Sequence, residues 1–484
     1  MMIADLHIHS KYSRATSRDC DLEHLELWAR RKGIGVLGTG DFTHPAWREE
    51  LSQKLEPAEE GLYRLKSELQ VKEKIGGRGI EPRFILSGEI SSIYKKNGKV
   101  RKVHNVILLP SLEAAEELAL KLEAIGNLHS DGRPILGLDS RDLLEITLET
   151  CPQAIFIPAH IWTPHFSLFG AYSGFDAIEE CFEDLTPYIH ALETGLSSDP
   201  PMNWRLSALD RFAMVSNSDA HSPANLAREA NLFDTQLSYP AIAHALENPS
   251  SREFFGTIEF FPEEGKYHMD GHRKCDLCLS PVQTSQYGGR CPVCGKKITI
   301  GVLHRVEQLA DRQEGYEKPG ARPFESLVPL PEVIAASTDK SAASVKVQRQ
   351  YEAMLAELGT EFSILRDIPL EAIRSCAGPC IEEGIRRLRQ GKVERIPGYG
   401  GEYGIIKIID KEEIAELCGQ VSFFESIALP AGKKKKAPEK RGTIPKEKAK
   451  EPAKESRQAP DNLRQQEAVT AEERVVAVIA GPGT

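Results

Sequence analysis

Short apolar strands alternate with helical stripes along the first half of the chain. Residues 2–4 and 35–38 are apolar runs of strand length, and between them Leu22, Leu25 and Ala29 recur at helical spacing. Asp21 is suited to cap this helix and Gly33 to end it. Strand, helix and strand in this order predict a repeating βα architecture.

Further apolar strands are expected at residues 84–88, 103–109, 154–159, 189–192 and 214–216. Polar side chains that suit metal binding stand at or near the ends of these strands. They are His7, His9, Asp41, His44, Glu89, His104, His160, Glu193, Asp219 and His221. In a βα barrel the carboxyl ends of the strands meet at one face, so we expect an α/β barrel with its active site there. Each residue alone is equally compatible with an exposed loop group, and His7 with His9 is also compatible with a buried structural pair.

Imidazole nitrogens combined with bridging carboxylates suit Zn²⁺, Mn²⁺ or Fe²⁺, and Mg²⁺ is a further candidate. Clusters of two or three such ions activate water and hold phosphoryl oxygens, which favours hydrolysis of a phosphoester.

The segments 5–10 and 219–221, Asp-Leu-His-Ile-His-Ser and Asp-Ala-His, resemble motifs of the polymerase and histidinol phosphatase (PHP) family. The resemblance implies a distorted (β/α)7 barrel. It implies a first metal on His7, His9, Glu89 and Asp219, a second on Glu89, His104 and His160, and a third that includes His221. The second motif is altered, because the segment 41–44 replaces the usual Asp-His pair, and Asp41 and His44 are both candidate metal ligands there. Asp219, His221 and Glu89 are the expected catalytic residues.

Three further residues are expected to support ligands or to contact substrate: Glu193, Tyr172 and Ser173. Residues 160–174 are rich in aromatic side chains and glycine and are suited to stack on a base, although they are equally suited to pack the barrel mouth.

Four of the ten cysteines form two Cys-x-x-Cys pairs, Cys275 with Cys278 and Cys291 with Cys294. Two such pairs at this spacing are typical of a four-thiolate zinc ribbon with a structural Zn²⁺, and a redox pair is the alternative. The polar loop between them is a candidate DNA contact.

The length of 484 residues predicts about three folded units. We expect a barrel (1–262), a zinc ribbon (263–304), a small helical domain (305–429), a disordered basic linker (430–460) and a truncated helicase-like fragment (461–484). Residues 431–460 carry a charge of +7, which leaves −17 for the remainder of the net −10. The sequence lacks an apolar run long enough to span a bilayer and a signal-peptide pattern at its start, so a cytoplasmic monomer without membrane contact is expected.

The order of barrel, four-cysteine ribbon and helical domain, with residues 40–45, 86–89 and 217–221, resembles the endonuclease Q family. This resemblance implies a DNA repair enzyme that nicks 5′ to deaminated bases (uracil, hypoxanthine, xanthine) and to abasic sites. Two alternatives stay open: a phosphatase of the PHP family acting on a small phosphomonoester, and a non-catalytic DNA-binding module. Residues 462–484 resemble the start of a superfamily 1 (UvrD-like) helicase that stops before its phosphate loop, and a helicase or a sliding clamp is a candidate partner.

Overall fold

The computed structural model describes residues 1–77, 79 and 81–417. All the described residues belong to the first of the chain's two units, Met1–Ala428. The linker expected at 430–460 and the helicase-like fragment expected at 461–484 lie outside the described residues.

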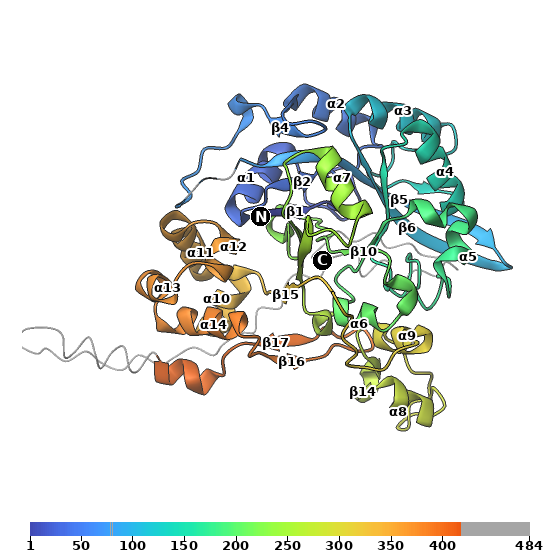
Figure 1. Ribbon diagram of the computed structural model, residues 1–484. Helices are drawn as coiled ribbons and strands as arrows, with labels where there is room; N and C mark the ends of the chain where they lie inside the picture. The colour runs from blue at the N-terminus through green and yellow to red at the C-terminus, as the bar shows by residue number, and fades with distance from the viewer. Residues whose placement is uncertain (78, 80, 418–484) are drawn as a thin grey trace, which may run out of the picture. The chain divides into compact units, whose positions relative to one another are not determined.

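A mixed sheet of eleven strands forms the centre of the first unit (Figure 1). Its main path runs β15-β12-β11-β1-β2-β5-β4-β3, while β6 and β7 pair with β5, and β8 pairs with β6. The strands are β1 (Met2–Asp5), β2 (Val36–Gly38), β3 (Leu55–Pro57), β4 (Tyr63–Leu65), β5 (Arg83–Lys96), β6 (Lys99–Leu109), β7 (Ile135–Leu136), β8 (Ile155–Pro158), β11 (Ala230–Phe233), β12 (Phe254–Glu259) and β15 (Phe324–Ser326). The predicted α/β class is confirmed.

Two further strands, β9 (Ala191–Glu193) and β10 (Ala213–Val215), form a separate parallel pair. Between β10 and β11, the side chain of Asn231 on β11 makes hydrogen bonds where a backbone ladder between the two strands would otherwise form. Its Oδ1 accepts from the Ser216 backbone N–H at 3.0 Å, and its Nδ2 donates to the Ser216 carbonyl oxygen at 2.8 Å. Among the described strands, no backbone ladder joins the β9–β10 pair to the eleven-stranded sheet, and on the side of β11 a side-chain amide makes the connection.

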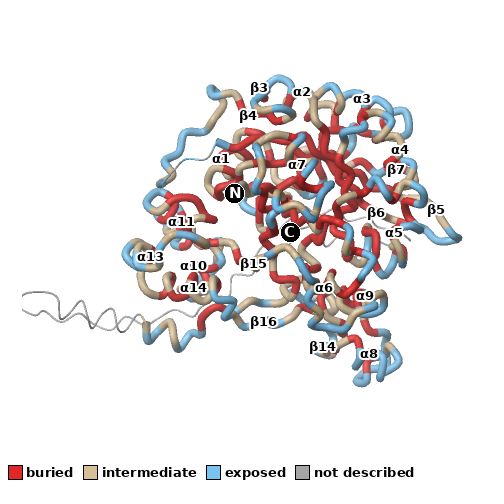
Figure 2. Tube along the Cα trace, in the orientation of Figure 1, coloured by how far each residue is buried: buried red, intermediate tan, exposed pale blue. Residues whose placement is uncertain are grey.

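Strands β2 and β8 are buried at every position. Continuous burial explains why their sequences are uninterrupted apolar runs rather than alternating ones, as is usual for strands covered on both faces. Figure 2 shows the buried residues gathered in the interior of the trace, with exposed residues on the outer helices and loops.

Seven α-helices lie among the described residues of 1–262, the region expected to form the barrel and called the barrel region below: α1 (Leu22–Lys32), α2 (Pro45–Lys54), α3 (Leu112–Glu123), α4 (Ser140–Thr150), α5 (Ile178–Phe182), α6 (Pro200–Trp204) and α7 (Tyr239–Glu247). Helix α1 begins and ends as predicted. Asp21 accepts from the backbone N–H of His24, and Gly33 takes a left-handed conformation with φ of 91°. A glycine suits this end because a β-carbon penalises positive φ.

The ribbon region contains a hairpin, β13 (Asp270–His272) and β14 (Leu277–Leu279), followed by α8 (Pro281–Gln286) and α9 (Val302–Leu309). Five helices follow: α10 (Leu330–Thr338), α11 (Val345–Leu358), α12 (Glu361–Arg366), α13 (Leu370–Ala377) and α14 (Pro379–Arg389). A second hairpin, β16 (Glu394–Ile396) with β17 (Ile405–Lys407), comes after them.

The helices of the C-terminal region pack against α1 through a buried ion pair. Lys32 Nζ lies 3.3 Å from Glu361 Oε1, and both side chains are almost inaccessible. No helix in the described ranges has the length and apolar character needed to cross a membrane.

Candidate metal centre

His7 and His9 follow β1 on extended backbone, where alternate side chains share a face. Their rings lie side by side with centroids 5.5 Å apart. Backbone hydrogen bonds join this segment to the second motif, because the Asp219 N–H donates to the His7 carbonyl and the His9 N–H donates to the Ala220 carbonyl. The two sequence motifs are thus neighbours at one end of the sheet.

A first group of residues that could hold a metal ion, called the first metal group below, consists of His7, His9, Glu89 and Asp219. His9 Nε2 lies 3.0 Å from Asp219 Oδ1 and 3.4 Å from Glu89 Oε2. His7 Nε2 lies 3.7 Å and 3.8 Å from the same two oxygens. Three of these atoms, His7 Nε2, His9 Nε2 and Asp219 Oδ1, are buried without a hydrogen-bond partner in the described part of the chain. Buried polar atoms are normally paired, so this donor set fits a cation.

A second metal group consists of Glu89, His104 and His160. Glu89 Oε1 lies 2.6 Å from His104 Nδ1 and 3.0 Å from His160 Nε2. Glu89 therefore turns one oxygen to each group, which is the arrangement expected of a carboxylate that bridges two ions.

The electrostatics of the centre favour ionised carboxylates. Burial alone would raise the pKa of Glu89, but the charges of His104, His7 and Arg133 outweigh it and hold that pKa well below its usual range. Burial alone would lower the pKa of His7, but the carboxylates of Glu193 and Glu89 outweigh it and raise that pKa well above its usual range. A divalent ion would take the positions that protons occupy on these rings.

Two carboxylates behind the histidines fix how the rings point. Glu193 at the end of β9 lies 3.0 Å from His7 Nδ1, and Asp41 lies 3.1 Å from His9 Nδ1. Asp41 also accepts hydrogen bonds from Ser10 and Ser13. Such contacts orient the Nε2 atoms toward an ion. Asp41 thus lies behind a ligand and outside both metal groups.

His44 also lies outside both groups. Its Nε2 is 3.2 Å from the carbonyl oxygen of His129, and its ring stacks on Tyr12 with centroids 4.3 Å apart. Burial lowers the pKa of His44. The side chain therefore packs beside the centre, and no contact in the described structure directs it to an ion.

His221 lies at the rim of the first group. Its ring centroid is 4.4 Å from that of His9, and Nδ1 is 2.9 Å from the Asp219 carbonyl oxygen. That contact requires a proton on Nδ1, which leaves the lone pair on Nε2. The structure does not bring a set of third-metal ligands together around it within the described residues.

Three of the predicted residues adopt left-handed backbone conformations that are uncommon for residues other than glycine. The φ angles are 51° at Asp41, 30° at His160 and 48° at Asp219. Such conformations persist only where the surroundings enforce them, and they cluster at functional sites.

Sequence reasoning missed Arg133, whose Nη1 lies 3.1 Å from Glu89 Oε2. The residue lies in a loop before β7, where no periodicity marks it, and its side chain keeps 27% exposure. Arg133 places a cation next to Glu89, where it is suited to contact a phosphate oxygen.

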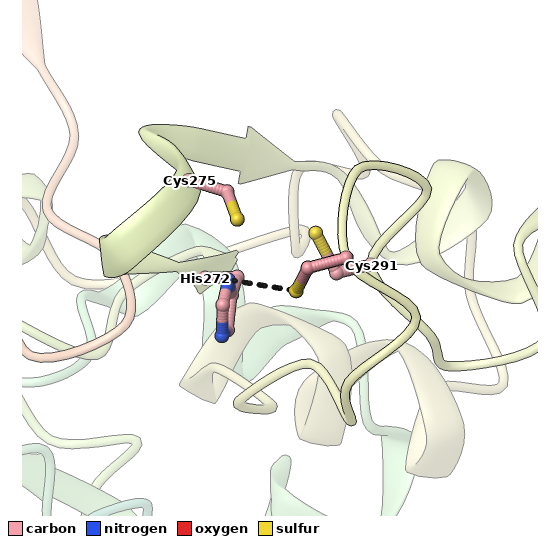
Figure 3. Close-up of side chains that lie close together, drawn as sticks. His272, Cys275 and Cys291 are labelled. Carbon is pink, nitrogen blue, oxygen red and sulfur yellow. Dashed lines mark hydrogen bonds between the residues drawn. The ribbon is translucent and has the colours of Figure 1, made fainter.

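A third group of possible ligands lies in the ribbon region and contains His272, Cys275, Cys291 and Cys294, with one ligand atom from each within 4.8 Å of the others. Figure 3 shows His272, Cys275 and Cys291 pointing toward a common space. Cys278 is exposed and lies outside this group. The structure thus brings three of the four predicted cysteines together and adds a histidine.

Solved structures resemble this arrangement over nearly their whole length. The lesion-specific endonuclease PfuEndoQ of Pyrococcus furiosus is 30% identical, with a TM-score of 0.73, and the match covers 86% of this chain and 98% of that one. An endonuclease Q complex with a 27-mer duplex that carries an abasic lesion is 31% identical, with a TM-score of 0.72 and coverage of 85% and 97%.

The chain belongs to the endonuclease Q family. Within it, residues 329–392 match the model of the MJ0043 C-terminal domain. The uncharacterized protein MJ0043 of Methanocaldococcus jannaschii is 33% identical over 254 residues, 51% of this chain but only 31% of that protein. The uncharacterized protein YqxK of Bacillus subtilis is 28% identical over 423 residues, 84% of this chain and 98% of that protein.

This endonuclease Q relative has a cavity of about 870 Å³ beside the candidate metal centre. Its walls include His165, Tyr172, Arg228 and Thr163, and the Thr163 hydroxyl lies 3.1 Å from Nδ1 of His160. The rings of His165 and Tyr172 stack with centroids 4.6 Å apart. Ser173 is buried and contacts the Phe166 N–H, so it shapes the same loop from behind.

Proposed function

We propose that the chain is a metal-dependent DNA repair endonuclease that nicks the strand 5′ to deaminated bases and abasic sites. The observation that carries the proposal is the pair of metal groups joined by Glu89. The chain that contains them matches 98% of the length of a lesion-specific endonuclease. A phosphatase for small phosphomonoesters would have no use for the ribbon region and the helices that follow it.

Divalent ions at the two groups would activate a water and offset charge on the phosphoryl oxygens. Glu89 sets the spacing of the groups. Glu193 fixes the orientation of the His7 ring, and Asp41 fixes that of the His9 ring. Arg133 would bind a non-bridging oxygen of the same phosphate. Addition of water at phosphorus with departure of the 3′ oxygen leaves a 3′-hydroxyl and a 5′-phosphate.

The damaged nucleotide would enter the 870 Å³ cavity after rotation out of the duplex. Unstacking costs a few kcal/mol and is least for mispaired or missing bases, which favours lesions. Tyr172, stacked on His165 and 54% exposed, supplies an aromatic face at the cavity wall. Tyr188 is also 54% exposed but does not line this cavity, so it serves as the control. Tyr172→Ala should therefore weaken nicking at deoxyuridine, and Tyr188→Ala should leave it unchanged.

The proposal is tested with end-labelled duplexes that carry a single deoxyuridine, deoxyinosine or abasic site, incubated with Mn²⁺ or Mg²⁺. Nicking 5′ to each lesion, with no cutting of the undamaged duplex, is the expected result. Asp219→Asn should abolish it while the thermal unfolding midpoint stays within a few degrees. Phosphate release from histidinol phosphate without nicking would favour the phosphatase, and tight DNA binding without either reaction would favour a non-catalytic module.

A further inference from the structure

The hairpin that begins the ribbon region determines which side chains can face a metal there. Strands β13 and β14 pair antiparallel, with His272 opposite Leu277 and Gly271 opposite Cys278. Residues directly opposite one another share a face of a sheet, and successive residues alternate. His272 and Cys278 therefore lie on opposite faces of the hairpin.

The two faces have different neighbours. On the face of His272, its Nδ1 lies 3.7 Å from Cys294 Sγ, and Cys275 and Cys291 complete the group. On the other face, Tyr399 covers Gly271 so closely that a β-carbon there would lie 2.5 Å from its ring. The Tyr399 hydroxyl donates to Asp276. A later segment of the chain thus packs on this face at Gly271, while Cys278 itself stays exposed and lies outside the ligand group.

We infer that the ribbon metal is bound by one histidine and three cysteines, His272, Cys275, Cys291 and Cys294, and that Cys278 is not a ligand. A tetrahedral zinc with Zn–S near 2.3 Å and Zn–N near 2.0 Å separates its ligand atoms by roughly 3.5 to 3.8 Å. The observed 3.7 Å between His272 Nδ1 and Cys294 Sγ meets this requirement without movement.

The spacing of the first ligand pair is also retained. His272 and Cys275 have two residues between them, as do Cys275 and Cys278. The pair His272 and Cys275 therefore has the same two-residue spacing between ligands as the pair Cys275 and Cys278, which is the spacing that such sites use. A Zn²⁺ with three thiolates carries a net charge of about −1 rather than the −2 of a four-thiolate site, which reduces repulsion of a nearby polyanion.

Cobalt substitution tests the ligand set in the full chain. Charge-transfer absorption from thiolate to Co²⁺ arises in the ribbon and not in the barrel groups, whose ligands are nitrogen and oxygen. Cys278→Ser should leave this absorption and the affinity for Co²⁺ unchanged. His272→Ala should shift the absorption and weaken Co²⁺ binding at least about tenfold. His272→Cys, which supplies a fourth thiolate, should raise the absorption by about one third.

A loss of about one quarter of the absorption in Cys278→Ser, with His272→Ala unchanged, would overturn the inference. A second measurement does not depend on the folding of variants. Alkylation of the zinc-loaded protein, read by mass spectrometry, should modify Cys278 while Cys275, Cys291 and Cys294 stay protected. Protection of Cys278 that disappears on chelation would assign it to the metal and reject His272.

Discussion

Oε1 of Glu193 lies 3.0 Å from Nδ1 of His7, and Oε2 of the same carboxylate accepts the backbone N–H of His160 at 2.8 Å. A single buried side chain thus positions one residue from each metal group. Asn217 Nδ2 donates to the same Oε1 at 2.8 Å and holds the carboxylate in place. The orientation of the centre therefore depends on residues that bind no ion themselves.

Glu193→Gln should weaken metal binding roughly tenfold to a hundredfold, because the amide keeps the shape but loses the charge that supports His7. Isothermal titration of metal-depleted protein with Mn²⁺ measures this. Glu180→Gln on the exposed face of α5 is the matched control. Unchanged affinity in Glu193→Gln would show that the contact is dispensable for metal binding.

Arg133→Met should lower nicking by about a hundredfold, as expected when one preorganised donor to a phosphoryl oxygen is removed. Metal affinity should stay equal or rise, because the guanidinium competes with a cation for Glu89. Arg14→Met, at 79% side-chain exposure, is the control. A loss of metal binding in Arg133→Met would contradict this role and indicate a structural one.

Glu259→Gln should change how stability depends on pH. Burial, together with the charge of Asp199, raises the pKa of Glu259 from 4.5 to about 8, so the folded protein holds a proton that the unfolded chain releases. The stabilisation that Glu259 contributes is then fully present below pH 4.5. It falls as pH rises toward 8, by at most about 1.4 kcal/mol per pH unit. Urea unfolding between pH 5 and 9 should show a shallower decline in the variant. Parallel curves for the two proteins would reject the assignment.

Glu361→Ala should reduce the free energy of unfolding by about 3 to 5 kcal/mol, because it leaves the buried Lys32 ammonium without its partner. It also removes the acceptor of the Tyr351 hydroxyl, which lies 2.8 Å from Glu361. Chemical denaturation gives the value, and exposed Glu352→Ala on α11 serves as the control. Equal stability of the two variants would show that the pair adds nothing to the packing of α12 on α1.

The strand ends of the barrel region could be predicted because each is encoded locally. A buried apolar run predicts a strand, and the carboxyl ends of neighbouring parallel strands share an edge. His7 and Asp219 follow β1 and β10, and they meet although more than two hundred residues separate them. The strand expected to end at Glu89 instead runs on to Lys96, so Glu89 joins them from within β5. The long β5–β6 hairpin was missed, even though Asn97 and Gly98 at its turn both have positive φ, which Asn-Gly pairs favour.

The precise role of each polar residue could not be predicted from local pattern. Asp41 lies behind His9 because its backbone turns at a φ of 51°, and no periodicity encodes that turn. The register of one short hairpin places His272, rather than Cys278, on the face of the metal ligands. A shift of that register by one residue would move every side chain of the strand to the opposite face. Spacing in the sequence is equally compatible with either pair.

The carboxylate of Glu89 has a thermodynamic consequence for the whole centre. Because each of its oxygens faces a different group, occupancy of one group changes the charge that the other offers to an ion. Linkage requires the effect to be mutual and equal in free energy. The two affinities are therefore a joint property of the protein, and a chelator that empties one position also alters how tightly the other holds its ion.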